Sequence, residues 1–167
     1  LAHEDESHRF AAARAGLLLG DRKAAVHALG DLARQPGPYQ ERALQLVLKV
    51  LAAPQANVLL SALANGTAPS RVLVRAVGSV GDPHYTRWLI EQMDDPQLAR
   101  LAGESFCMIT GADLAALGLE CAPPQDLAPG PNDDPQDDDV GMEEDEGLPW
   151  PDVSQVDAWW QSNVRRF

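Results

Sequence analysis

Apolar residues recur at helical spacing over most of the first 117 positions, and residues 69–96 show the pattern most clearly. The residues spaced four apart are Val72, Ala76 and Val80 in the first half of this stretch, and Tyr85, Leu89 and Met93 in the second. Each set lies on one face of a helix. Between them, Gly81 suits a helix C-terminus, Asp82 a cap and Pro83 a first helical turn. The stretch predicts a helical hairpin, which cannot bury both apolar faces alone.

The same periodicity predicts further helices, each bounded by glycine, proline or aspartate. They are expected at 3–19 and 22–34, from Tyr39 to Val50, from Pro54 to about Asn65, at 96–110, at 114–117, and after a cap at Asp152 or Ser154. Aromatic residues are few, and Ala, Leu and Val supply most of the apolar content. This composition favours packed helices over a β-sandwich. The fold class is therefore expected to be all-α.

The breaks between helices recur about thirty residues apart, which is typical of a solenoid of helix pairs. They lie at 20–21, 53–54, 81–83 and 111–113. The runs 75–83 and 94–102 resemble the repeat of HEAT-like proteins of the bacterial phycobilisome-lyase type, although the usual Val-Arg pair appears as Ala99-Arg100. The likeness covers residues 8–117, and the second repeat uses Pro54 in place of a Gly-Asp turn. It implies an α-solenoid whose second helices line a concave face.

From about Cys121 the helical pattern stops, and prolines and acidic residues follow. We expect three parts: HEAT-like repeats at 1–120, an acidic Pro/Asp-rich linker at 121–149, and a tryptophan-containing helix at 150–167 that caps the repeats. A Pro-flanked Trp150, the aspartate cap and the Trp159-Trp160 pair are similar to the end of an uncharacterised proteobacterial HEAT-like family found near type VI secretion loci. Without an initiator methionine or a closing signal, the chain is expected to be a fragment of a longer protein.

The formal net charge of −12 is distributed unevenly. Residues 1–100 carry eleven basic and ten acidic side chains, whereas residues 101–164 carry fifteen acidic and no basic ones. Neither part has the basic stripe that nucleic-acid binding needs, so no nucleic-acid partner is expected. No apolar run is long enough to span a bilayer, and no signal-peptide pattern is present, so no membrane association is expected. Cys107 is expected to be a buried small hydrophobe, and the two cysteines favour a reducing cytoplasm.

No motif in the chain predicts catalysis or a cofactor or metal site. The acidic run does not match a calcium loop, because proline or aspartate falls where the loop needs a ligand or glycine. His3 and His8 are five residues apart, which does not suit a helical metal pair. Ser105 lacks the glycine that follows a nucleophile elbow, and Gly78 to Gly81 end a helix instead of opening one around a phosphate. The chain is therefore not expected to be an enzyme.

The composition and the resemblance together predict a non-catalytic protein–protein interaction scaffold. The candidate partner-binding residues are Arg87, Trp88, Glu91, Trp150, Trp159 and Trp160. Tryptophan and arginine are enriched at binding hot spots, although core packing remains an alternative role for Trp88. Adjacent positions on one helix predict that only one of Trp159 and Trp160 faces inward. The expected partner is another protein, which the second resemblance associates with type VI secretion.

Two alternative functions stay open. Related HEAT-like repeats hold a tetrapyrrole in their groove, so the first resemblance also implies an enzyme of the bilin-lyase type or another small-molecule enzyme on the same repeats. A nucleic-acid-binding HEAT-like protein is the third possibility, which the sparse Lys and Arg residues of the first hundred positions disfavour.

Overall fold

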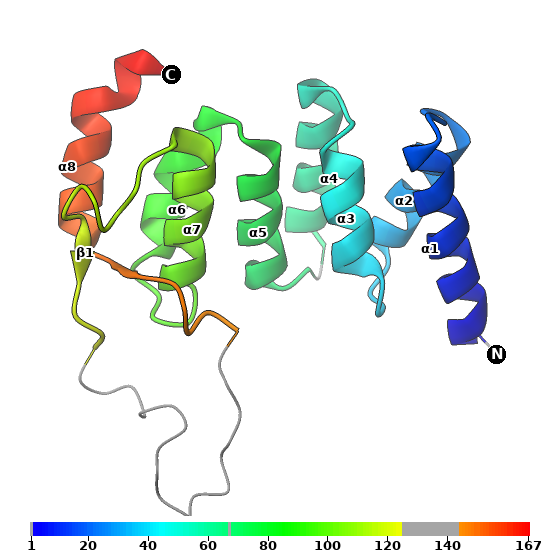
Figure 1. Ribbon diagram of the computed structural model, residues 1–167, viewed down its shortest axis with the longest axis horizontal. Helices are drawn as coiled ribbons and strands as arrows, with labels where there is room; N and C mark the ends of the chain where they lie inside the picture. The colour runs from blue at the N-terminus through cyan, green and yellow to red at the C-terminus, as the bar shows by residue number, and fades with distance from the viewer. Residues whose placement is uncertain (1, 67, 125–143) are drawn as a thin grey trace, which may run out of the picture. The chain divides into compact units, whose positions relative to one another are not determined.

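The computed structural model of the chain describes residues 2–66, 68–124 and 144–167. These residues are mostly helical, which confirms the all-α prediction at the level of secondary structure (Figure 1). They form two compact units, Leu1–Asp82 and Pro83–Phe167. Most of the acidic linker predicted at 121–149 lies outside the described residues. Among the described helices, none combines the length and the apolar composition that crossing a membrane requires.

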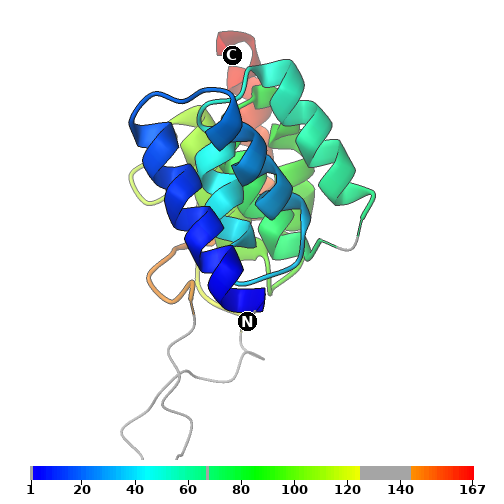
Figure 2. The same cartoon turned by 90° about the vertical axis from the view of Figure 1, so that its right-hand side faces the viewer.

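The first unit consists of helices that alternate between two layers. They are α1 (Ala2–Leu18), α2 (Ala24–Arg34), α3 (Gln40–Leu48), α4 (Ala53–Ala64) and α5 (Ser70–Val80). Helices α1 and α3 lie in one layer, and α2 and α4 lie in the other (Figures 1 and 2). Helix α2 contacts both α1 and α3, and α5 contacts both α3 and α4. Each helix thus packs against helices that are near it in the chain.

Small residues allow the helices of the first unit to approach closely. A Cβ atom on Gly16 would lie 3.3 Å from the Cβ atom of Ala25, so α1 and α2 touch at that point. Leu29, Ala33, Ala43 and other aliphatic side chains of this unit are buried. Such a core is stabilised by apolar area removed from water, at about 25 cal/mol per Å².

Two helix ends of the first unit lie at the breaks that the sequence predicts, one at Asp21 and one at Gly81. Gly81 follows α5 with φ of 72°, a left-handed conformation that only glycine adopts without strain. The Asp21 carboxylate accepts hydrogen bonds from the backbone N–H groups of Lys23, Ala24 and Ala25, at 2.8, 3.0 and 3.3 Å. The first of these bonds contributes most to lowering the pKa of Asp21. The predicted cap of the second helix is therefore confirmed.

The second unit combines helices with one short strand pair. Its elements are the 3-10 turn η1 (Pro83–Tyr85), α6 (Thr86–Gln92), α7 (Ala99–Thr110), β1 (Glu120–Cys121), β2 (Trp150–Pro151), α8 (Val153–Asn163) and η2 (Val164–Arg166). Helix α6 contacts both α7 and α8, and β2 contacts α7. The two strands are antiparallel, with Cys121 opposite Trp150. The sequence did not predict this pair, because each strand is only two residues long and the two are far apart in the chain.

Two boundaries in this unit differ from the prediction. The helix expected at 114–117 is a run of turns, in which Asp113 accepts a hydrogen bond from the Ala116 N–H at 3.0 Å. Gly118 follows with φ of 65°. A helix of one turn is unstable, because its single hydrogen-bonded turn does not offset the free-energy cost of nucleation. The helix expected at 96–110 begins at Ala99, because the preceding Asp95–Leu98 segment forms turns.

Candidate functional site

Helix α6 carries three of the predicted partner-binding residues side by side. Arg87 and Glu91 are one helical turn apart, and their side chains are 63% and 61% exposed. Trp88 lies next to Arg87 and is half-buried. The helix therefore presents a cation, an anion and part of an indole ring on a backbone that is fixed by its buried neighbours Leu89 and Ile90.

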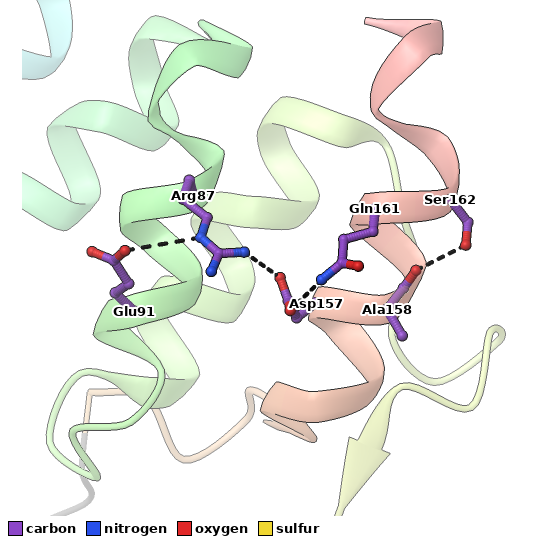
Figure 3. A network of polar contacts seen from close by, with 6 residues as sticks. All are labelled: Arg87, Glu91, Asp157, Ala158, Gln161 and Ser162. Carbon is purple, nitrogen blue, oxygen red and sulfur yellow. Dashed lines mark hydrogen bonds and ion pairs between the residues drawn. The ribbon is translucent and has the colours of Figure 1, made fainter.

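A charged network attaches this surface to helix α8 (Figure 3). Arg87 Nη1 donates to Asp157 Oδ1 at 2.7 Å, and Arg87 Nε lies 3.9 Å from Glu91 Oε1. The second oxygen of Asp157 accepts a hydrogen bond from Gln161 Nε2 at 2.7 Å. Exposed ion pairs contribute only about 0.2–1 kcal/mol to stability. The network therefore orients the Arg87 guanidinium more than it stabilises the fold.

The tryptophan pair of α8 packs on Phe106 of α7. The Phe106 ring is fully buried, and its centroid lies 5.8 Å from Trp159 and 6.4 Å from Trp160, both in edge-to-face geometry. Trp160 is buried as well and contacts Phe167, whereas Trp159 is half-buried. The prediction that only one of the pair faces inward is wrong, because both large rings reach the same phenyl ring from adjacent positions.

The remaining candidate, Trp150, lies apart from this network on β2. The Arg100 guanidinium carbon is 4.9 Å from its ring centroid, a cation–π contact. Next to it, the Asp152 N–H donates to the Leu119 carbonyl at 2.8 Å, and the Asp152 carboxylate caps α8. The structure thus brings the residues of α6 and α8 together through Asp157 and places Trp150 in a separate contact.

Hydrogen bonds at the start of α8 lower the pKa of its capping residue, Asp152. The Ser154 hydroxyl donates to Asp152 Oδ1 at 2.7 Å, and Gln155 donates from its side chain at 2.7 Å and from its backbone N–H at 3.1 Å. These bonds favour the carboxylate form and lower the pKa of Asp152 to about 2, with the Ser154 hydroxyl as the largest cause. Asp152 is one of the two cap residues that the sequence predicted, and its carboxylate therefore stays ionised at neutral pH.

The cysteines and histidines lie in ordinary surroundings. Cys107 is half-buried, and its burial raises the pKa of the thiol, which disfavours the reactive thiolate. Cys121 is an exposed free thiol, and its Sγ contacts the Pro151 carbonyl at 3.6 Å. His27 pairs with Asp31 at 3.1 Å, and His84 packs edge-on against Tyr85. Among the described residues, no three His, Cys, Asp or Glu side chains gather as metal ligands would.

The structure also reveals a groove in the first unit that the sequence did not predict. It has a volume of about 320 Å³ and lies between α1 and α3. It is lined by Phe10, Arg14, Arg42, Gln45, Leu46 and Lys49. The spacing of its α3 residues puts them on one face of that helix. Their proximity to α1 depends on tertiary packing, which periodicity alone does not reveal.

Comparison with protein-family models, with curated proteins and with solved structures finds no match to this chain.

Proposed function

We propose that this chain is a non-catalytic protein-binding module whose helix pairs stack as a HEAT-like α-solenoid, and that the α6 surface binds the partner. The alternating layers of the first unit support the stacking, since the helices in contact are one or two elements apart in the chain. In a solenoid each pair packs only on adjacent pairs, and the terminal pair needs a cap. The contacts of Trp159 and Trp160 with Phe106 suit that capping role for α8.

The observation that carries the proposal is the surface formed by Arg87, Trp88 and Glu91. Two charged side chains remain more than half exposed there, beside a partly exposed tryptophan. Tryptophan and arginine are enriched at binding hot spots. Tryptophan buries a large area at a small cost in conformational entropy, and the planar arginine fork forms several hydrogen bonds and stacks on rings. The hydrogen bond from Arg87 to Asp157 holds the guanidinium in place before a partner arrives, which lowers the cost of binding.

The proposed partner is another cytoplasmic protein. The resemblance to the HEAT-like family found near type VI secretion loci associates this partner with type VI secretion. Photocrosslinking in the native cell tests this assignment. A photoreactive amino acid at position 91 is expected to capture one predominant protein, identified by mass spectrometry. The same residue at position 58, which replaces the exposed Val58 of α4, is the control and is not expected to capture that protein.

Variants of the surface then test which side chains bind. Arg87→Glu and Trp88→Phe are expected to weaken recovery of the crosslinked partner at least about tenfold, as hot-spot substitutions do. Arg165→Glu changes another exposed arginine of the same unit and is expected to leave recovery unchanged. Equal capture from positions 58 and 91, or wild-type recovery with Arg87→Glu and Trp88→Phe, would contradict the α6 assignment.

A further inference from the structure

We infer that the groove between α1 and α3 binds an acidic peptide segment of another protein. The inference extends the proposed function to a second surface, which is in a different unit from α6 and rests on separate observations. Arg14, Arg42 and Lys49 surround the groove, while Phe10 and Leu46 supply its apolar lining.

The apolar side of the groove is held in place by ring packing. Phe10 is buried, and its ring stacks on Tyr39 with centroids 5.0 Å apart and planes inclined by 26°. Leu46 is half-buried beside it on α3. A side chain entering the groove would therefore meet a preformed apolar wall, and a preformed wall lowers the entropic cost of binding.

Among the described residues, the three cations at the groove have no internal partners. In the part of the chain that the structure describes, Arg14, Arg42 and Lys49 form no hydrogen bond or ion pair, and all three are exposed. The neighbouring acid on α3, Glu41, instead pairs with Arg75 at 3.1 Å. Three like charges around one groove repel each other, and a bound anion relieves that repulsion. The two arginines can grip a carboxylate with paired hydrogen bonds, whereas lysine acts as a point charge.

The spacing of the cations matches a short peptide. Arg42 lies on α3 and Lys49, seven residues later, is the C-cap residue of that helix, so the two are about 10 Å apart along the helix axis. Three residues of a peptide in the polyproline II conformation span about 9 Å, and side chains three residues apart lie on the same face of that helix. Two carboxylates three residues apart can thus reach both cations, while an apolar residue between them contacts Leu46 and Phe10.

Charge favours a peptide over a nucleic acid at this groove. Nucleic-acid affinity grows with the number of phosphates that are neutralised, and three cations neutralise few. The whole chain has a formal net charge of −12, and this net negative charge repels a long polyanion. A short acidic peptide confines its charge to the groove and also uses the apolar wall, which a phosphate backbone cannot.

Fluorescence anisotropy of the full chain tests the inference. The probe is a fluorescein-labelled peptide with the core Asp-Glu-Leu-Asp-Glu, and its amide counterpart Asn-Gln-Leu-Asn-Gln is the uncharged comparison. The chain is expected to bind the acidic probe and not the amide probe. The double change Arg42→Glu and Lys49→Glu is expected to weaken binding at least about tenfold, because like charges would then face the probe. The milder pair Arg42→Gln and Lys49→Gln is expected to weaken it less, and circular dichroism confirms that both variants fold.

The matched control is the double change Arg22→Glu and Lys23→Glu. It reverses the charges of two exposed cations that precede α2 and lie outside the groove. It changes the net charge by the same amount and is expected to retain the wild-type affinity. No binding of the acidic probe, or equal losses in the groove and control variants, would overturn the inference. Tighter binding of a fluorescein-labelled single-stranded oligonucleotide than of the peptide, lost in the groove variant, would also overturn it. The α6 variants leave the groove intact, so failure here is distinguishable from failure of the proposed function.

Discussion

At the scale of single residues, Phe106 is the largest fully buried side chain among the described residues. Its ring is fully buried and contacts both tryptophans of α8. Phe106 follows the apolar spacing of the helix predicted at 96–110, and this spacing accounts for its inward direction. The sequence did not predict that two adjacent tryptophans share this ring, since helical periodicity assigns a direction to each side chain but not the size of the neighbour that it meets.

Replacing this ring should therefore destabilise the second unit strongly. Phe106→Ala is expected to lower the free energy of unfolding by about 3–5 kcal/mol, since it removes a fully buried aromatic ring and leaves a cavity. All four tryptophans of the chain lie in this unit, so urea unfolding followed by tryptophan fluorescence measures the effect. Phe167→Ala, at a phenylalanine that is 47% exposed, serves as the control and is expected to cost much less. Equal losses in the two variants would contradict the central position of Phe106.

A second residue of this unit carries a polar group that the fold leaves unsatisfied. The Thr86 side chain is fully buried, and its hydroxyl has no hydrogen-bond partner among the residues that the structure describes. Burying an unpaired hydroxyl costs about 1–3 kcal/mol, and valine has nearly the same shape. Thr86→Val is therefore expected to raise the free energy of unfolding by about 1 kcal/mol, measured by urea unfolding. Thr86→Ser keeps the hydroxyl and removes a methyl group, and should destabilise. A loss of stability in Thr86→Val would show that the hydroxyl is satisfied in solution.

At the scale of elements, three helix ends were predictable from a local cause, whereas the helix expected at 114–117 and the start of the helix expected at 96–110 were wrong. Asp21, Gly81 and Asp152 stop or start helices through their own backbone or carboxylate chemistry, and the structure confirms each. The elements that were missed depend on distant partners. The β1–β2 pair joins segments about thirty residues apart, and the groove joins α1 to α3. Local pattern therefore predicted the helices, while the contacts that build the candidate sites came from packing.

The cap of α8 predicts how the second unit responds to acid. The pKa of Asp152 is lowered from 3.8 to about 2, so its stabilising effect is complete above about pH 4 and disappears as the pH falls through about 2. Asp152→Asn keeps a capping side chain but cannot titrate. The variant is expected to lose less stability than wild type between pH 4 and pH 2, as measured by tryptophan fluorescence. Asp94→Asn, at an exposed carboxylate outside this cap, should keep the wild-type dependence, and an unchanged dependence in Asp152→Asn would refute the assignment.

The packing of α7 predicts a second element-scale effect. A Cβ atom on Gly103 would lie 3.3 Å from Leu114 Cδ1 and 3.5 Å from Pro151 Cγ, so α7 approaches the 112–119 segment and β2 closely. Gly103→Val adds branched bulk at that contact and is expected to destabilise the unit by about 1–3 kcal/mol. Gly147→Val is the control, because a Cβ atom there would meet no described atom within 4 Å. Comparable urea midpoints for the two variants would show that α7 can shift to accept the side chain.

At the scale of the whole chain, opposing electrostatic effects act on stability and on binding. The formal net charge of −12 arises mostly from the fifteen acidic side chains between residues 101 and 164, and their mutual repulsion opposes a compact state. The groove in the first unit has the opposite local sign, since three cations line it. Dissolved salt weakens both the repulsion and the attraction, because it shortens the range of every exposed charge.

Salt is therefore expected to change stability and peptide binding in opposite directions. Raising NaCl from about 0.01 M to about 0.1 M shortens the screening length from about 30 Å to about 10 Å. The melting temperature, followed by circular dichroism, should rise by a few degrees, while the affinity of the groove for the acidic probe should fall severalfold. A variant with Asn in place of Asp133, Asp134, Asp137, Asp138 and Asp139 removes five negative charges. It should show a smaller rise in melting temperature and a similar loss of affinity, because the groove keeps its cations. A melting temperature that falls with salt would mean that attractive pairs such as Arg75–Glu41 outweigh the repulsion.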